Sequence, residues 1–306
     1  MIRNMLRILA TDGIDKSARD ELESMGHEVT EQYFEPEELK KALADYDVVV
    51  VRSATKVKAP IIDAAADAGR LKMIIRAGVG VDNIDVDYAE AKGIKVRNTP
   101  NSSSASVAEL ALAHMFSLAR FVGISNVTMR EGKWNKKNYT GVELSGKTLG
   151  LVGFGRISIE LAKKATALGM KVLYTNRRGP REDFPEYGYS TLEELLRLSD
   201  FVSIHTPSLE GGKALIGMNE LKLMKNTAYI INCARGGIVD EEALLQALES
   251  GDLAGAGIDV FVEEPTKNLA LINHPRVSST PHIGGSTAEA QERIGGEIVE
   301  IIKTSF

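Results

Sequence analysis

The chain has 306 residues, more than one domain usually contains, and this length predicts two domains. Hydrophobic residues make up 43% and charged residues 26%, the balance of a globular protein rather than a disordered one. The net charge of -5 comes without a dense block of lysine or arginine, which argues against nucleic acid or a membrane surface as partner. No apolar run reaches the roughly 18 residues of a membrane span. The start resembles a strand rather than a signal sequence, and one cysteine excludes an internal disulfide, so we expect a cytoplasmic protein.

The first hundred residues alternate between strands and helices. Strands are expected at 7–10, 48–51, 71–75 and 94–97, and helices at 15–25 and 36–43. The β-branched run of residues 48–51 is typical of a parallel strand covered on both faces. Arg52 and Ser53 follow this strand, while Arg76, Gly78 and Gly80 follow the next. Open α/β sheets bind ligands at this end of their strands, although solvated loops are the alternative.

A breaker around residue 100 leads into a long helix, which we expect to begin near Ser106 and to continue through Val122. Its apolar surface is broad enough to meet both its own domain and a second subunit. We interpret His114, within it, as a packing histidine with satisfied ring nitrogens. Trp134 then follows in a basic segment, which is either a solvated loop or an anion-binding arm.

From residue 146 onward, strands and helices alternate and predict a parallel sheet built of βαβ units. The expected strands are 148–152, 171–175, 201–205, 228–232, 257–261 and 277–280. Each is followed by a group able to bind a ligand or do chemistry: Gly153-Phe154-Gly155, Asn176-Arg177-Arg178, His205-Thr206-Pro207, Ala234–Gly237, Val262–Pro265 and Pro281–Gly285. Because the carboxyl ends of parallel strands share one edge of a sheet, we expect these groups to form one site.

The glycine turn at residues 153–155 indicates where a dinucleotide binds. Gly153 permits the tight turn, and Gly155 lets the backbone approach a pyrophosphate that the following helix N-terminus stabilises. Ser158 stands where a third glycine is usual, so we expect a slightly displaced helix rather than a lost site. Taken alone, this motif is also compatible with a simple packing turn.

The residue at the end of the second strand of such a unit is normally acidic, because it binds the adenosine ribose and repels a 2′-phosphate. Here it is Asn176, followed by Arg177 and Arg178. The pattern predicts acceptance of NADP or relaxed cofactor choice, with two ordinary surface arginines as the alternative.

Three residues on the same edge fit hydride transfer between nicotinamide and a 2-hydroxy acid. His282 is a candidate acid/base, because imidazole titrates near working pH. Glu264 is suited to fix its tautomer, and Arg235 to hold the substrate carboxylate. Taken alone, each residue is also compatible with an ordinary structural role in a surface loop. Only their joint position on one edge of the sheet favours catalysis. No histidine or cysteine cluster has metal-ligand spacing, and we interpret Cys233 as a small buried hydrophobe.

The chain resembles, from end to end, the D-isomer-specific 2-hydroxyacid dehydrogenase family. The stretches that carry the resemblance are Arg52–Lys56, Arg76–Asp85, Ile231–Asp240, Asp259–Pro265 and Thr280–Thr287. It implies an α/β fold with a Rossmann doubly wound parallel sheet and a second, smaller flavodoxin-like α/β domain formed from both chain ends. The implied substrate domain is 1–99 and 286–306, and the implied dinucleotide-binding domain is 100–285.

The resemblance also implies roles for individual residues. The catalytic residues are Arg235, Glu264 and His282. The substrate-side residues are Arg52, Ser53, Arg76, Gly78, Val79 and Asn101. The cofactor-side residues are Gly153, Phe154, Gly155, Arg156, Ile157, Asn176, Arg177, His205, Thr206, Pro207, Cys233, Ala234, Asp259 and Gly284.

The implied activity is NAD(P)-dependent oxidation of 3-phospho-D-glycerate to 3-phosphohydroxypyruvate, at the head of serine synthesis. Two alternatives stay open: an NADP-linked glyoxylate or hydroxypyruvate reductase, and a dinucleotide-sensing protein of the corepressor type. The family further implies a homodimer through the nucleotide-binding domain, with Lys136 or Lys137 reaching the neighbouring subunit's site. Because the chain stops at Phe306, we expect no C-terminal module for feedback by serine.

Overall fold

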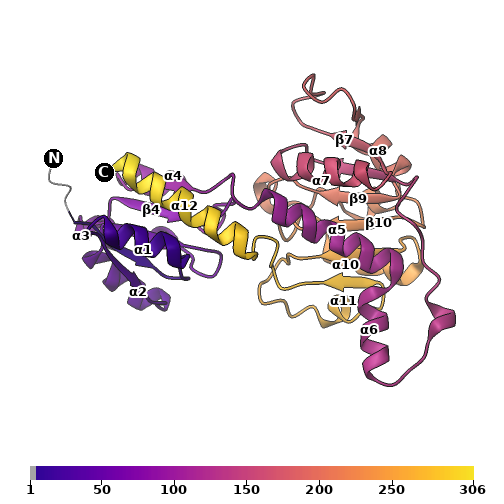
Figure 1. The fold of residues 1–306 in the computed structure, drawn as a ribbon, viewed down its shortest axis with the longest axis horizontal. Helices are drawn as coiled ribbons and strands as arrows, with labels where there is room; N and C mark the ends of the chain where they lie inside the picture. Colours follow the sequence, from indigo (N-terminus) through magenta and orange to yellow (C-terminus); the bar gives the residue numbers. More distant parts are fainter. Residues whose placement is uncertain (1–4) are drawn as a thin grey trace. The chain divides into compact units, whose positions relative to one another are not determined.

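The computed structural model describes residues 5–306, apart from the side chain of Glu210. Residues 1–4, with which the predicted substrate domain begins, lie outside the described residues. The chain divides into two compact units, unit 1 (Met1–Ser103 and Gly285–Phe306) and unit 2 (Ser104–Gly284). Each unit holds one parallel sheet with helices packed on it, as Figure 1 shows.

Unit 1 has a five-stranded sheet in the order β2-β1-β3-β4-β5, the flavodoxin-like arrangement. Its elements are β1 (Arg7–Ala10), α1 (Lys16–Ser24), β2 (Glu28–Glu31), α2 (Pro36–Ala42), η1 (Leu43–Asp45), β3 (Val48–Val51), α3 (Ala59–Ala68), β4 (Met73–Arg76), α4 (Val86–Ala91), β5 (Lys95–Asn98) and α12 (Ala288–Ser305).

The central strand β3 explains why unit 1 needs helices on both faces. Val48 and Val50 pack into the cluster that includes α1 and α12, while Val49 and Val51 pack into the cluster of α2, α3 and α4. All four valines are fully buried, as expected for a parallel strand covered on both sides. The C-terminal helix α12 thus completes the core begun by the N-terminal residues.

Unit 2 has a seven-stranded sheet in the order β12-β11-β10-β9-β6-β7-β8, with all recorded pairs parallel. The strand order reverses between β6 and β9, which is the switch point of a Rossmann sheet. Its elements are α5 (Ser104–Arg120), α6 (Val122–Arg130), η2 (Lys136–Asn138), β6 (Thr148–Val152), α7 (Arg156–Ala167), β7 (Lys171–Thr175), β8 (Gly188–Tyr189), α8 (Leu192–Leu198), β9 (Phe201–Ile204), η3 (Glu210–Gly212), α9 (Met218–Leu221), β10 (Tyr229–Asn232), α10 (Glu241–Ser250), β11 (Gly255–Ile258), α11 (Leu269–Ile272) and β12 (Val277–Ser279).

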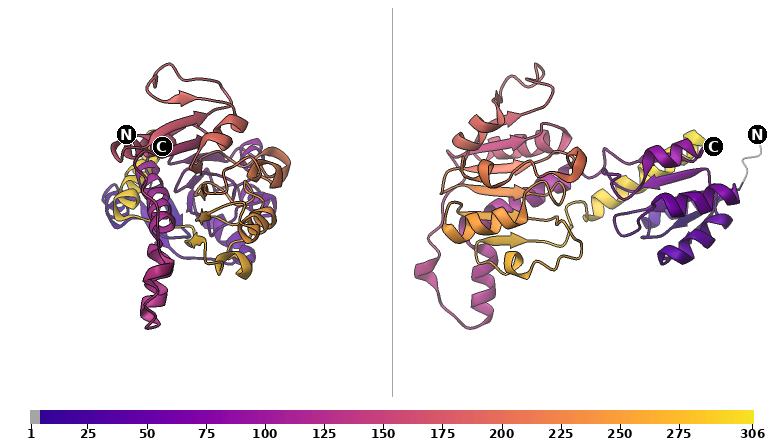
Figure 2. Two further views of the ribbon diagram at one scale, coloured as in Figure 1. Left: turned by 90° about the vertical axis from the view of Figure 1, so that its right-hand side faces the viewer. Right: turned by 180° about the vertical axis from the view of Figure 1, so that it is seen from behind.

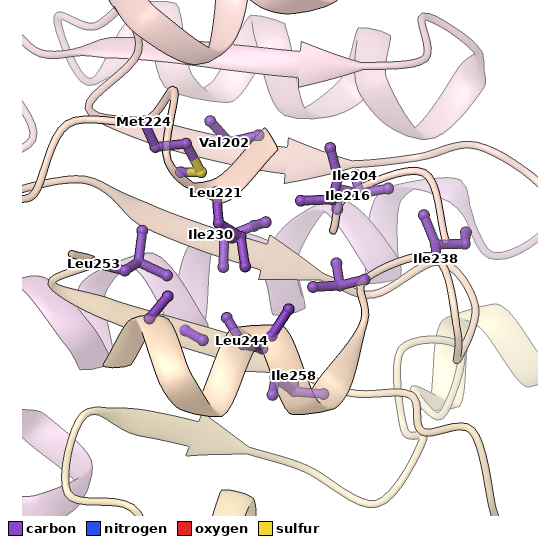
Figure 3. Close-up of a cluster of buried hydrophobic side chains, with 14 of the residues drawn as sticks. Val202, Ile204, Ile216, Leu221, Met224, Ile230, Ile238, Leu244, Leu253 and Ile258 are labelled. Atoms are coloured by element: carbon purple, nitrogen blue, oxygen red, sulfur yellow. The ribbon is translucent and has the colours of Figure 1, made fainter. Parts of the chain in front are cut away.

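Two buried clusters cover the faces of this sheet. On one face α5 and α7 pack together against β6, β9 and β10. Figure 3 shows the other face, where Val202 and Ile204 of β9, Ile230 of β10 and Leu244 of α10 belong to one buried cluster. The sheet is therefore held on both sides, and its carboxyl edge is left for the loops.

The structure corrects one predicted strand. The strand expected at 257–261 is β11, which lies at Gly255–Ile258 instead. Its glycines resemble a turn in the sequence, but they allow close packing. A Cβ on Gly257 would lie 2.7 Å from the Cβ of His114 in α5, and one on Gly255 would lie 2.8 Å from a carbonyl oxygen. The short strand β8 was not predicted.

The long helix predicted through residue 122 is also corrected. Helix α5 ends at Arg120, Phe121 adopts a left-handed conformation with φ of 56°, and α6 then begins at Val122. No residue of α6 is buried, and Figure 2 shows this helix extending away from the sheet of unit 2. Among the described residues no single helix is long and apolar enough to cross a membrane, although α5 and α6, bent by 64°, reach that length and composition together.

Candidate active site

The glycine turn lies at the switch point, where β6 ends beside β9. Gly153 has φ of +88°, and a Cβ added to it would lie 2.7 Å from the carbonyl oxygen of His205 and 2.8 Å from Thr206 Cγ2. Only glycine fits without displacing the loop after β9. The first glycine of the motif is therefore required by the contact between two strand ends.

The N-terminus of α7 fits the pyrophosphate of a dinucleotide. Gly155 is its N-cap, and no side chain accepts a hydrogen bond from the first turn. A Cβ on Gly155 would meet nothing within 4 Å, so the approach to these N–H groups is open. An anion at this position would satisfy the free donors and the helix dipole.

Ser158, at the third position of the motif, is fully buried. Its hydroxyl donates a hydrogen bond of 2.7 Å to the carbonyl oxygen of Gly153. Of the other predicted cofactor residues in this stretch, Phe154 is buried, Ile157 is half-buried and Arg156 is exposed. The serine thus ties the helix to the turn that precedes it.

The end of β7 presents no carboxylate at position 176. The side-chain oxygen of Asn176 accepts a hydrogen bond from the backbone N–H of Arg178 at 3.3 Å, which orders the turn. The side chains of Arg177 and Arg178 are exposed. The structure therefore has an amide at the position where a ribose-binding acid is usual, followed directly by two exposed cations.

At the carboxyl ends of β9 and β10, His205 is half-buried, with its Nδ1 atom enclosed, and Cys233 is buried. The Nε2 atom of His205 lies 2.9 Å from the hydroxyl of Ser203, and burial lowers the pKa of His205 to about 4. Burial, with a smaller effect of the Asp259 carboxylate, raises the pKa of Cys233. The ring therefore stays neutral and the thiol stays protonated. The prediction that Cys233 is a buried hydrophobe is confirmed.

Arg235 lies on the turn after β10, and Asn232 holds that turn. The Asn232 side chain donates to the carbonyl oxygen of Arg235 at 2.9 Å and accepts from the N–H of Ala234 at 3.1 Å. Gly236 packs so closely on the next loop that a Cβ there would lie 1.9 Å from the carbonyl oxygen of Phe261. Sequence reasoning missed Asn232, whose only signal is a polar residue at the end of an apolar strand.

His282 and Glu264 form a pair on neighbouring loops. The Nδ1 atom of His282 lies 2.7 Å from Oε2 of Glu264, whose other oxygen accepts the N–H of Phe261 at 3.0 Å. Burial raises the pKa of Glu264, but the hydrogen bonds from His282 and Phe261 and the charges of His282 and Arg235 outweigh it, so the pKa lies below its ordinary value. The carboxylate is thus ionised and its partner nitrogen is Nδ1.

Asp259 fixes the loop that carries His282. Its buried carboxylate accepts three hydrogen bonds, from Thr280 Oγ1 at 2.6 Å and from the N–H groups of Ile283 and Gly284 at 2.8 Å each. The N–H of His282 also donates to the Asp259 carbonyl oxygen at 2.8 Å. His282 has φ of 53°, a strained conformation that such contacts hold in place. Asp259 was predicted to be a cofactor-side residue, and the hydrogen bonds that its side chain accepts come from the loop that carries His282.

The predicted substrate-side residues all belong to unit 1. Arg52 and Arg76 lie at the carboxyl ends of the adjacent strands β3 and β4. Asp12, which sequence reasoning missed, accepts the backbone N–H of Arg52 at 2.7 Å. The Arg76 side chain lies over Gly78, where a Cβ would be 1.4 Å from Nη1.

The remaining substrate-side residues lie on loops of the same unit. Ser53 and Val79 are exposed. The backbone N–H of Asn101 donates to Glu297 of α12 at 3.2 Å. In unit 2, the predicted arm residues Lys136 and Lys137 are exposed in η2. Among residues 5–306, no group of three or more His, Cys, Asp or Glu side chains is placed to hold a metal ion.

A glycine turn at the switch point, together with a histidine–carboxylate pair and an arginine on the same edge, defines an NAD(P)-dependent oxidoreductase. The D-isomer specific 2-hydroxyacid dehydrogenase family, by its NAD binding domain, matches residues 112–284. The chain belongs to this family.

The similar proteins include two named activities. A hydroxypyruvate reductase from Thermotoga maritima is 48% identical over 97% of this chain and 97% of its own. The D-3-phosphoglycerate dehydrogenase of Homo sapiens is 44% identical over 96% of this chain and 55% of its own. This chain therefore spans about half the length of that relative.

Solved structures show the same fold over nearly the whole chain. A protein from Thermus thermophilus has a TM-score of 0.88 at 37% identity, covering 96% of this chain and 95% of its own. The NADPH-dependent glyoxylate/hydroxypyruvate reductase of Sinorhizobium meliloti, in complex with NADP and malonate, has a TM-score of 0.85 at 29% identity, covering 98% and 93%.

Proposed function

We propose that this protein interconverts 3-phospho-D-glycerate and 3-phosphohydroxypyruvate with a nicotinamide dinucleotide. The observation that carries the proposal is the pair of His282 and Glu264, 2.7 Å apart, on the sheet edge that also presents Arg235. An acid/base and a carboxylate-binding cation beside a dinucleotide site are what 2-hydroxy acid chemistry requires.

In the oxidative direction, His282 accepts the proton of the C2 hydroxyl. Because Nδ1 faces Glu264, the nitrogen that exchanges this proton is Nε2. The ionised Glu264 stabilises the imidazolium that results. Arg235 binds the substrate carboxylate and so orients C2. A dinucleotide held at the glycine turn would accept the hydride that leaves C2. The hydroxyl proton passes to His282, and the C2 carbonyl of the product results.

Unit 1 supplies the phosphate-binding residues in this proposal. Arg52 and Arg76 follow adjacent parallel strands, an arrangement that supports two cations acting on one phosphate. The backbone of Gly78 and Val79, with Asn101, is assigned to the substrate carboxylate side. We accordingly treat unit 1 as the substrate domain and unit 2 as the dinucleotide-binding domain.

A second candidate is an NADP-linked reductase of hydroxypyruvate or glyoxylate. The absence of a carboxylate at Asn176 and the exposed Arg177 and Arg178 favour it. The Thermotoga maritima hydroxypyruvate reductase supports it too, because that relative and this chain match over nearly their full lengths.

Steady-state kinetics with two substrates and two cofactors separates the candidates. Phosphohydroxypyruvate and hydroxypyruvate are each reduced with NADH and with NADPH. We expect kcat/KM to favour the phosphorylated acid by at least about 10-fold, and Arg52→Ala to abolish most of that preference. Equal kcat/KM values for the two acids would favour the reductase and remove the phosphate role from Arg52 and Arg76.

We also propose that the protein is a homodimer through unit 2. Helix α6 has no buried residue, and exposed apolar side chains gather on α5, α6 and the following loop: Phe116, Val122, Val127, Met129 and Trp134. Exposed apolar side chains grouped along neighbouring elements often mark a protein–protein interface. Lys136 or Lys137 would then reach the neighbouring subunit's site.

A further inference from the structure

We infer that Glu241, the first residue of α10, is a positioning residue for the catalytic Glu264. This inference rests on the proposed function, in which Glu264 pairs with His282. Glu241 Oε1 accepts the backbone N–H of Val262 at 2.8 Å, and Oε2 accepts the side-chain amide of Asn268 at 3.0 Å. One carboxylate therefore joins the two ends of the loop that carries Glu264.

Gly236 packs against the backbone at the start of this loop, and Glu264 itself bonds to Phe261 and His282, but the rest of the loop has few other contacts. Between Val262 and Lys267 no side chain is buried, and Val262 itself is 69% exposed. The ion pair of Lys267 with Glu263 joins two side chains that are 81% and 60% exposed, and such surface pairs contribute little. Apolar packing thus cannot fix the loop, and its geometry depends on the few hydrogen bonds it makes.

Glu241 itself sits on a rigid base. Asp240 caps α10 by accepting the N–H groups of Glu242 and Ala243, and Leu244 of the same helix is buried against the sheet, as Figure 3 shows. Catalytic side chains on loops need such anchoring to a scaffold, because a misplacement of about 1 Å can cost about 100-fold in rate. The contact therefore transfers the rigidity of α10 to Glu264.

Glu242 provides a matched control on the same helix turn. It is exposed, and within residues 5–306 its carboxylate makes no hydrogen bond or ion pair. Glu242→Ala therefore removes the same charge from the start of α10 without touching the loop.

Single substitutions test the contact by separating kcat from KM. Glu241→Ala is expected to lower kcat about 10- to 100-fold, to change the KM for the dinucleotide less than about 2-fold, and to leave the far-UV circular dichroism unchanged. Glu242→Ala is expected to keep kcat within about 2-fold. In a background of Glu264→Gln, Glu241→Ala should cost almost nothing further, because it acts through Glu264.

Reversing the hydrogen bond is a second test that does not depend on Glu241→Ala folding. Asn268→Asp keeps the oxygen that caps α11 through Leu271 but sets a carboxylate against Glu241, so kcat should fall. Adding Glu241→Gln restores a donor and an acceptor in the opposite sense, and kcat should recover at least partly.

The outcomes separate this inference from the function on which it rests. If Glu264→Gln lowers kcat while Glu241→Ala and Asn268→Asp do not, the positioning role of Glu241 is wrong and the proposed function stands. If Glu264→Gln and His282→Ala both turn over normally, the proposed catalytic residues are wrong. Additive losses in the double variant would also refute the positioning role.

Discussion

Replacing Asp259 with asparagine should both destabilise the protein and impair catalysis. The carboxylate accepts two hydrogen bonds at Oδ1, from Thr280 and Ile283, and one at Oδ2, from Gly284. In either orientation, an amide would place its NH2 group against at least one backbone N–H. An unsatisfied buried donor costs roughly 1–3 kcal/mol, and hydrogen bonds to a charged acceptor are worth roughly 1.5–3 kcal/mol each. We therefore expect Asp259→Asn to lower the free energy of unfolding by about 2–4 kcal/mol.

The catalytic loss follows from the strained backbone of His282. Without its contacts to Asp259, the loop would relax, and we expect kcat/KM to fall about 100-fold. Urea unfolding followed by far-UV circular dichroism gives the stability change, and steady-state reduction of phosphohydroxypyruvate gives the rate. Asp252→Asn, at an exposed carboxylate that accepts a hydrogen bond from the Ser250 hydroxyl, is the control and should change neither quantity appreciably. Wild-type stability and kcat/KM in Asp259→Asn would refute the assignment.

Two further changes test the switch point. Gly153→Ala should raise the Kd for NADH at least about 10-fold, because the added Cβ would lie 2.7 Å from a carbonyl oxygen. Gly146→Ala, which has a similar positive φ and open space around it, should leave that Kd unchanged, and equal Kd values in both variants would contradict the steric argument. Stability should fall as the pH drops from about 6.5 to about 4, since the unfolded state protonates His205 and the folded state does not. Between a pH above 6.5 and a pH below 4, this effect should lower the free energy of unfolding by about 3 kcal/mol. His205→Gln should flatten this pH dependence in urea unfolding, and an unchanged slope would count against it.

The local sequence pattern was sufficient to predict most strands and the burial of individual side chains. The predicted strands 148–152 and 171–175 are β6 and β7, because runs of apolar and β-branched residues between turns have few other stable conformations. His114 is buried, with its ring nitrogens 3.0 and 3.1 Å from the hydroxyls of Ser278 and Thr280, as a satisfied packing histidine should be. These features depend on residue type and on near neighbours along the chain.

Pattern failed where a contact between distant elements overrides local preference. The glycines of β11 resemble a turn, yet they form a strand because α5 packs directly on them. Helix α5 ends at Arg120 although apolar residues continue, because Phe121 leaves the helical conformation and α6 takes a new direction.

The sequence alone determined the kinds of group at the sheet edge, because each follows a recognisable strand. It indicated a dinucleotide turn, an arginine, a carboxylate and a histidine. Only the tertiary structure decided how two of them are held: Asp259 holds the His282 loop, and Glu241 holds the Glu264 loop. The physical reason is that Asp259 and Glu241 each bind atoms more than 20 residues away, so no local period or motif records the contact.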